Sequence, residues 1–258
     1  MALPHVTGWA GRWRLVLRRL RCVLAADQLA LLQELACSAA THAQPRTLAF
    51  VNAHAMNLAA EHTMFAEHLA GADVLLRDGA CLALLLRWLG RPPGSNLNGT
   101  DFIPRLLEAC NGQGLAIIGT RPPYLSRGAA MAAQLAPLSP ICTADGFQTT
   151  AHYRELLQTN RPPLVLLAMG MPRQEAVALE LRRTLGYPCL IVCGGAIVDF
   201  WAGKTSRAPA WLRQGGLEWL WRLGQEPRRL FKRYVIGNPL FVLRAACFFS
   251  LGQLPPLR

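Results

Sequence analysis

Two polar residues, Asn52 and Asp78, each follow a short apolar run at the point where a predicted strand ends. These runs are residues 47–51 and 73–76. In an open α/β sheet, ligands bind outside the carboxyl ends of the strands. Turn formation accounts for glycines at such positions, but it accounts less well for Asn52 and Asp78, because both lie beside apolar sequence. A carboxylate at this edge can remove a proton from an attacking hydroxyl group.

Positive charge is concentrated at the two ends of the chain. Residues 204–258 contain 10 basic and 2 acidic side chains, and residues 1–26 contain five arginines and no acid, within a net charge of +12. Cationic groups stabilise a departing phosphate, so an acid, amides and a basic tail suit the transfer of a group from a phosphate-activated donor. The same charge suits nucleic acid or an anionic lipid surface, and both alternatives stay open at this point.

Several other chemistries lack their sequence motifs. The chain has no GxxxxGK[ST] phosphate loop, no GxSxG nucleophile elbow and no HExxH arrangement. It has no DxD pair, and its eight cysteines show no zinc-ligand spacing, so we expect no metal site and buried, reduced thiols of a cytosolic protein. No uncharged apolar run reaches 18 residues, so a membrane span is not expected.

The elements that must position these residues form a repeating pattern between residues 46 and 203. Apolar runs predict strands at residues 47–51, 73–76, 115–118, 140–143, 164–168 and 190–192. Helical patterns lie at residues 55–69, 80–89, 124–135 and 173–185. Nearly continuous apolar strands that alternate with helices predict an α/β fold, in which a parallel sheet carries helices on both faces.

Two segments flank this core. Residues 1–45 are expected to be basic and mostly helical. Residues 204–258 are rich in Trp, Arg and Leu and predict a helical, basic appendage, with residues 217–234 mostly helical and Pro227 bending or interrupting them. Trp and Arg suit a membrane interface, and a basic groove over a phosphate ligand is an equally physical interpretation.

Distinct sequence blocks follow one another in a fixed order along the chain. They are Asn52 with His54-Ala-Met-Asn57, Arg77-Asp78-Gly79, Gly99-Thr100-Asp101, Gly170-Met-Pro172-Arg173-Gln174-Glu175, Arg207-Ala-Pro209 and Glu218-Trp219-Leu-Trp221-Arg222-Leu. Over about residues 46–235, this order resembles the bacterial WecG/TagA/CpsF glycosyltransferase family. The Gly-x-Pro-basic-Gln-Glu block and the two later blocks are specific when they occur together.

The resemblance implies a Rossmann-like sheet and an activity. Family members transfer a sugar from a nucleotide diphosphate donor to a polyprenyl-diphosphate-linked saccharide, invert the anomeric centre and need no metal. The expected donor is a UDP-hexose or UDP-N-acetylhexosamine, since glucose and N-acetylmannosamine are both used in the family. The UDP-sugar is then a substrate and no cofactor is expected. The implied setting is surface polysaccharide or exopolysaccharide synthesis, with the protein cytoplasmic and peripheral on the inner face of the bacterial cell membrane.

The resemblance also assigns roles, motif by motif. It implies that Asp78 is the general base. It implies substrate-binding roles for Asn52, Thr100, Asp101, Gln174, Arg222, Arg229 and Lys232. Lys232 stands where the family has a third tail arginine, and Arg233 is adjacent; a lysine offers a point charge where an arginine offers a fork. Phe50 replaces a threonine often found two residues before the asparagine, which bears on pocket specificity.

Two other classes of protein fit parts of the sequence. A nucleic-acid-binding protein would use the basic ends, but RNP and helix-turn-helix signatures are absent, so no nucleic-acid partner is expected. A non-catalytic membrane-associated protein would have lost the site, whereas Asp78, Gln174 and Arg222 are all retained. A homo-oligomer is compatible with the sequence.

Overall fold

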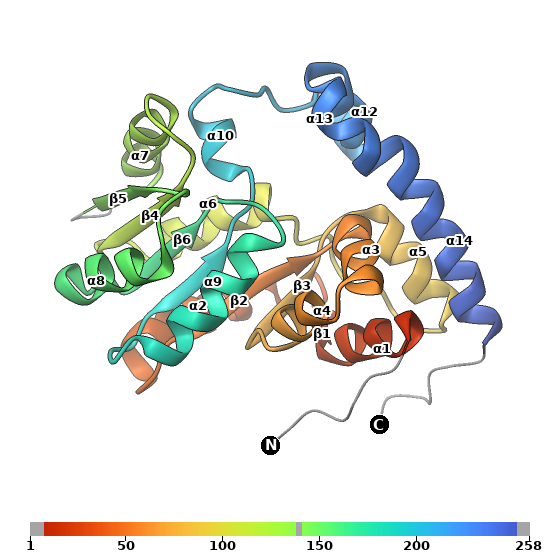
Figure 1. Cartoon of the computed structure of the whole chain (residues 1–258). Helices are drawn as coiled ribbons and strands as arrows, with labels where there is room; N and C mark the ends of the chain where they lie inside the picture. The colour runs from red at the N-terminus through yellow and green to blue at the C-terminus, as the bar shows by residue number, and fades with distance from the viewer. Residues whose placement is uncertain (1–7, 138–140, 252–258) are drawn as a thin grey trace.

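A computed structural model describes residues 8–137 and 141–251 of the chain. Its centre is a seven-stranded, all-parallel sheet with the strand order β1-β3-β2-β7-β6-β4-β5 (Figure 1). The strands are β1 (Leu20–Arg21), β2 (Arg46–Val51), β3 (Val74–Arg77), β4 (Leu115–Gly119), β5 (Ile141–Asp145), β6 (Leu164–Leu167) and β7 (Leu190–Cys193). The α/β fold predicted from the alternating pattern is confirmed.

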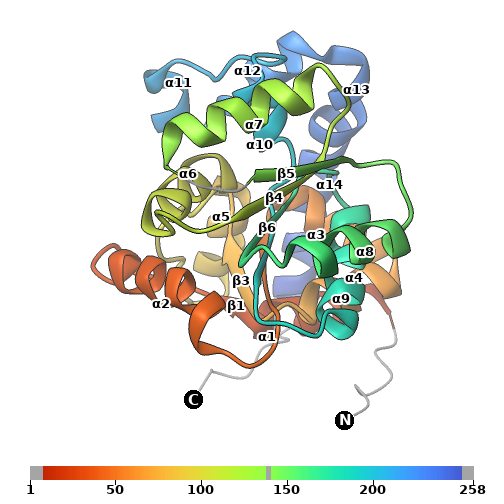
Figure 2. The same ribbon diagram turned by 90° about the vertical axis from the view of Figure 1, so that its left-hand side faces the viewer.

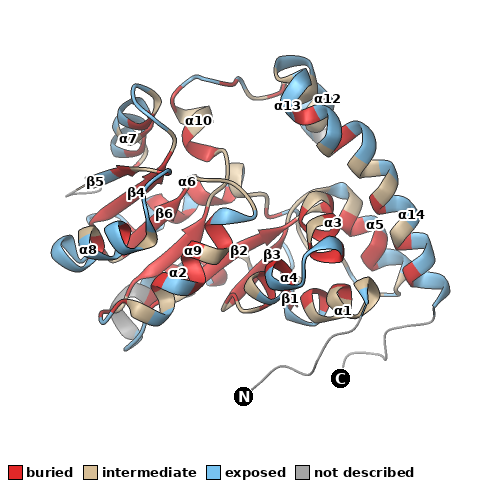
Figure 3. Ribbon diagram, in the orientation of Figure 1, coloured by how far each residue is buried: buried red, intermediate tan, exposed pale blue. Residues whose placement is uncertain are grey.

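Helices cover both faces of the sheet. They are α1 (Trp9–Arg19), α2 (Gln28–Thr41), α3 (Ala53–Glu61), α4 (Thr63–Ala70), α5 (Ala80–Trp88), α6 (Gly99–Ala109), α7 (Tyr124–Leu135), α8 (Thr150–Asn160), α9 (Arg173–Thr184) and α10 (Ile197–Trp201). One apolar cluster joins the sheet to α1, α3, α4, α5, α8, α9 and the C-terminal helix, and a second joins it to α2, α6, α7 and α10. Burial on both faces explains why the central strands are almost wholly apolar (Figure 3).

The core contains elements that the sequence patterns missed. The helix expected at residues 55–69 is two helices, α3 and α4, separated at His62. Helices α6 and α8 were not predicted, and Pro104 lies inside α6. The strand expected at residues 140–143 corresponds to β5, Ile141–Asp145. Residue 140 lies outside the described residues.

The N-terminal segment is mostly helical, as expected, although β1 adds a short edge strand to the sheet. Two of its arginines form hydrogen bonds that join α1 to α3 and α4. The Arg12 guanidinium donates to the carbonyls of Ala59 (3.0 Å) and Ala60, at the end of α3. Arg19 donates to the carbonyls of Ala70 and Ala72, at the end of α4. Ala59, Ala60 and Ala70 belong to the last turns of their helices, where carbonyls lack an intrahelical partner, and Ala72 lies just beyond α4. The two arginines therefore cap two helix ends.

The C-terminal segment consists of helices, as the sequence indicated. They are α11 (Ala210–Gln214), α12 (Glu218–Gln225), α13 (Pro227–Phe231), the π-helix η1 (Lys232–Ile236) and α14 (Gly237–Ser250). Pro227 interrupts the helical path as predicted, because it is the first residue of α13. Figures 1 and 2 show α11–α13 at the end of the molecule near α10, while α14 runs back along α5 and α3 towards α1.

Helix α14 completes the core of the molecule. Phe241 and Phe248 are fully buried, with ring centroids 5.4 Å and 5.5 Å from that of Trp13 in α1. The Asn57 amide of α3 donates to the Gly237 carbonyl (2.7 Å) at the start of α14, and Arg244 donates to the Asn57 side-chain oxygen (3.0 Å). The appendage is therefore fixed to both α1 and α3.

Candidate active site

Two cavities meet at the carboxyl ends of β2 and β3. The first, of about 590 Å³, extends over the loops that follow β6 and β7 and beneath α13 and η1; we name it the sheet-edge cavity. The second, of about 520 Å³, lies between the start of α5 and helix α12; we name it the helix-side cavity. Six residues line both cavities: Asn52, His54, Asp78, Thr100, Arg222 and Arg233. The junction of the two cavities therefore contains Asn52 and Asp78, the polar residues that follow two of the predicted strands.

Asn52 and Asp78 are held together by the ends of adjacent strands. Strand β2 ends at Val51 and β3 at Arg77, and the Asp78 amide donates to the Val51 carbonyl (2.8 Å). Asn52 caps α3 by accepting from the Ala55 amide (3.0 Å), and its own amide donates to an Asp78 carboxylate oxygen (3.1 Å). The cap fixes the Asn52 side chain, and Asn52 in turn orients the carboxylate.

The Asp78 carboxylate is poised to accept a proton. Loss of surrounding water raises its pKa above the ordinary 3.8, while the hydrogen bond from Asn52 and the charges of Arg233, Arg222 and Arg77 oppose this rise. A base is most effective when its pKa lies near the working pH, so a raised pKa favours this role. The hydrogen bond from Asn52 and these positive charges favour the ionised form.

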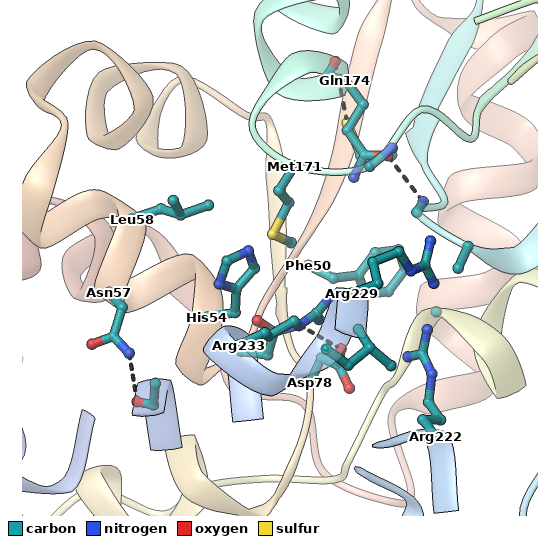
Figure 4. A pocket seen from close by; sticks show the side chains of 18 of the residues that line it. Phe50, His54, Asn57, Leu58, Asp78, Met171, Gln174, Arg222, Arg229 and Arg233 are labelled. Atoms are coloured by element: carbon teal, nitrogen blue, oxygen red, sulfur yellow. Dashed lines mark hydrogen bonds between the residues drawn. The ribbon is translucent and has the colours of Figure 1, made fainter. Parts of the chain in front are cut away.

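Arginines from the appendage surround this carboxylate (Figure 4). Arg222 of α12 packs on the Phe200 ring at 5.0 Å, and Arg229 of α13 pairs with Glu226. Arg229 and Lys232 line the sheet-edge cavity, whereas Arg222 and Arg233 line both cavities. The appendage thus brings four cations to the edge of the sheet.

Lys232 and Arg233, adjacent in the sequence, differ in their relation to the Asp78 carboxylate. Lys232 is exposed at the rim of the sheet-edge cavity. Arg233 is more deeply placed, and burial together with nearby cations lowers its pKa while Asp78 acts in the opposite direction. Arg233 is therefore the cation of this pair that interacts with Asp78. The family resemblance assigned the substrate contact to Lys232 and left the adjacent Arg233 as the alternative.

His54 is a residue of the junction that the sequence analysis missed. It lies two residues after Asn52 on α3 and lines both cavities beside Arg233 (Figure 4). Burial, followed by the charge of Arg233, lowers the pKa of His54 from 6.5 to about 4. The imidazole is therefore neutral near pH 7 and can both donate and accept a hydrogen bond. Its position directly after a strand end was the available signal.

Gln174 joins two loops of the sheet-edge cavity. Its side-chain oxygen accepts from the amides of Gly170 (3.2 Å) and Gly195 (3.0 Å), which follow β6 and β7. Its amide nitrogen donates to Glu175 (2.9 Å), a buried carboxyl whose pKa burial raises from 4.5 to about 7. Gln174 therefore shapes the cavity wall and has one N–H left for a ligand.

Thr100 and Asp101 lie at the start of α6 but face different surroundings. Thr100 lines both cavities. Asp101 lines neither; its carboxylate pairs with Arg207 (2.7 Å) and Arg213 (3.7 Å), and Asn98 donates to it (2.8 Å). The geometry makes Asp101 a link between α6 and the appendage, and its substrate-binding role stays a prediction.

The part of the chain that the structure describes contains no group of three or more His, Cys, Asp or Glu side chains arranged to hold a metal ion. Metal independence is a separate prediction that this observation does not test. The described helices also include none long and apolar enough to cross a membrane.

These features define a class: an α/β protein whose sheet edge presents one carboxylate among several cations. The family model described as "Glycosyl transferase WecG/TagA/CpsF family" matches residues 19–251. The chain belongs to this family, and it is a glycosyltransferase of cell-surface polysaccharide synthesis. The resemblance drawn from the sequence blocks is confirmed, and the match extends beyond the expected residues at both ends.

Proposed function

We propose that this chain transfers a hexose or N-acetylhexosamine from a UDP-sugar to a polyprenyl-diphosphate-linked saccharide, with inversion and without a metal. The observation that carries the proposal is the position of Asp78 at the junction of two cavities and among cations. A sugar transfer brings two substrates to one carbon, and the junction has room for one on each side. Membership of the family supports the reaction class.

The reaction is a single displacement at the anomeric carbon of the donor. Asp78 accepts the proton of an acceptor hydroxyl as its oxygen forms a bond to that carbon. The bond from the carbon to the diphosphate oxygen breaks, and its electron pair leaves with UDP. Arg222, Arg229 and Arg233 are placed to stabilise the negative charge that develops on the leaving diphosphate. Attack from the face opposite the leaving group inverts the anomeric centre.

The surface of the appendage suits a lipid-linked acceptor. Phe231, Ile236, Leu243 and Phe249 are all more than half exposed along α13, η1 and α14. Exposed apolar side chains beside basic ones are typical of a protein that binds at a membrane interface. We therefore propose that the protein binds peripherally to the inner face of the cell membrane, where both substrates meet.

The test is UDP release in the presence of lipid-diphosphate-linked saccharides. The purified chain is incubated with a panel of UDP-hexoses and UDP-N-acetylhexosamines, each with and without an acceptor panel of farnesyl-diphosphate-linked sugars. Acceptor-dependent UDP release and a product with inverted anomeric configuration support the proposal. Release that is independent of every acceptor, or a product that retains the donor configuration, contradicts it. Binding to nucleic acid without any transfer would favour the alternative class.

A further inference from the structure

The division of the site into two cavities indicates where each substrate binds. In a single displacement, the attacking and leaving oxygens lie on opposite sides of the reacting carbon, so the two substrates extend in opposite directions from it. Asp78 is at the shared wall, and the two cavities extend from it towards β6–β7 and towards α5–α12, respectively. The chemistry of the two linings differs, and this difference assigns the substrates.

The sheet-edge cavity is suited to a nucleoside diphosphate. It is lined by Arg229 and Lys232 in addition to the two shared arginines. Of its three acids, Glu61 and Asp199 are already paired, with Arg244 and Lys204 respectively, and Asp78 is shared with the helix-side cavity. The cations therefore outweigh the available negative charge, and glycine-rich loops after β6 and β7 allow close approach of a ligand to the backbone.

The helix-side cavity also has three arginines of its own, Arg77, Arg87 and Arg213. Arg77 is engaged by the backbone carbonyls to which it donates, and Arg213 pairs with Asp101. The remaining polar groups are those of a saccharide site. Glu218 and Trp219 of α12 face it from the appendage, and Asn96, Asn98 and Asn238 face it from other elements. Asn96 accepts from the Gly79 amide (2.7 Å), which fixes its orientation. Glu218 has no hydrogen bond or ion pair among the residues that the structure describes, and burial raises its pKa. An unpaired carboxylate beside amides and an aromatic ring suits a ligand rich in hydroxyl groups.

The rim of this cavity also fits a lipid-linked ligand. Ala80, Ala83 and Arg87 of α5 line the cavity, while Leu84 and Trp88 form the adjacent stripe of the same helix. These two apolar side chains are 37% and 36% exposed. A prenyl chain that leaves the cavity along α5 would meet this stripe and then the apolar surface of α14, which packs beside α5.

We propose that the helix-side cavity binds the saccharide of the lipid-linked acceptor, and that Glu218 accepts hydrogen bonds from its hydroxyl groups. This inference rests on the proposed function and names the acceptor part of it. Glu218 is then a specificity-determining residue, because it favours a saccharide that presents hydroxyl donors at its position.

The experiment compares binding of UDP, bare farnesyl diphosphate and farnesyl diphosphates that carry hexoses or N-acetylhexosamines, by isothermal titration calorimetry. The wild-type chain should bind at least one sugar-bearing probe more tightly than bare farnesyl diphosphate. Glu218→Gln should reduce this advantage about 10- to 100-fold, the effect of losing a hydrogen bond to a charged group, and leave UDP and bare farnesyl diphosphate within about two-fold. The exposed Glu180→Gln on α9 is the matched control and should bind every probe as the wild type does.

A second pair of variants tests the assignment without relying on Glu218. Asn238→Trp fills the helix-side cavity, and Ala196→Trp fills the sheet-edge cavity. The first should lose the sugar-bearing probe and keep UDP, and the second should do the reverse. Thermal unfolding followed by circular dichroism identifies any variant that fails to fold.

The inference is overturned if Glu218→Gln keeps the sugar-dependent advantage, if no sugar-bearing probe exceeds bare farnesyl diphosphate, or if Asn238→Trp loses UDP and retains the acceptor probe. Its failure differs from failure of the proposed function. If only the inference fails, the wild type still releases UDP when an acceptor is present, but Glu218→Gln has an unchanged KM for that acceptor. If the proposed function itself fails, no pair of donor and acceptor gives any transfer.

Discussion

Replacing Asp78 by asparagine tests the centre of the proposed mechanism. Asparagine retains an oxygen that can accept the hydrogen bond from Asn52, so the local structure at the ends of β2 and β3 should be preserved. The variant has no group that can take the proton at this position. Loss of a general base typically lowers the rate by about 10²- to 10⁴-fold. We expect kcat to fall by that factor, while the affinity for UDP changes little.

The pH dependence gives this prediction a second, independent measure. Only the ionised carboxylate can accept the proton, so activity should fall as the pH decreases through the raised pKa of Asp78. The Asn52 hydrogen bond favours the ionised form, so Asn52→Ala should raise this pKa further and move the acid limb to higher pH. A hydrogen bond to a charged group contributes about 1.5–3 kcal/mol, which corresponds to a displacement of about 1–2 pH units. Arg233→Gln removes a nearby positive charge and should move the limb in the same direction.

The assay is UDP release across pH with saturating substrates, together with UDP binding by calorimetry. His54→Gln is the informative comparison, because the neutral imidazole is the other proton acceptor at the junction. A folded Asp78→Asn enzyme with near-normal kcat would refute the reasoning. So would an acid limb that persists in Asp78→Asn and disappears in His54→Gln, since the histidine would then be the base.

Three further predictions concern stability, metal and membrane. The folded state binds more protons than the unfolded state between pH 4.5 and about 7, because burial raises the pKa of Glu175, so stability should fall as pH rises through this range. Glu175→Gln should remove this slope and stabilise the fold above about pH 7 by on the order of 3 kcal/mol in urea unfolding, and an unchanged slope would contradict it. Transfer should persist in EDTA; abolition by EDTA with recovery on addition of Mn²⁺ would show that a metal is required. Leu243→Ser with Phe249→Ser should weaken sedimentation with phosphatidylglycerol-containing vesicles while thermal stability is kept, because both side chains are exposed; unchanged sedimentation would place the membrane contact elsewhere.

The sequence predicted the parts of the fold that depend on local patterns. Strands β2, β3, β4, β6 and β7 are short and almost wholly apolar, so their positions were evident from hydrophobicity alone. Helix α6 was missed because it begins at a glycine and contains Pro104, both of which usually indicate a break in a helix. The split between α3 and α4 was missed because the apolar pattern continues across His62.

The arrangement of the site depended on long-range packing that sequence spacing does not describe. Asn52 and Asp78 were predicted to lie at the same edge, because parallel strands end together, and the structure joins them by a hydrogen bond. The choice between Lys232 and Arg233 could not be made, because it depends on the π-helix η1. A π-helix has wider turns than an α-helix, so the directions of successive side chains depart from the usual spacing.

The two ends of the chain act together on the position of the arginines, although neither end contains Asp78. Trp13 of α1 donates to the Met56 carbonyl (2.7 Å) and packs against Phe241 and Phe248, so α1 fastens α14 to α3. Arg233 lies in η1, and α14 follows η1 directly. The anchoring of α14 on α1 and α3 therefore also helps to hold Arg233 in the cavity walls that contain Asp78. Among the N-terminal arginines, Arg12 and Arg19 donate to carbonyls at helix ends, and Arg21 pairs with Glu34 of α2. Positive charge near the N-terminus thus contributes to the packing of α1 on α3 and α4, whereas four cations of the C-terminal segment line the cavity that we propose for the donor diphosphate.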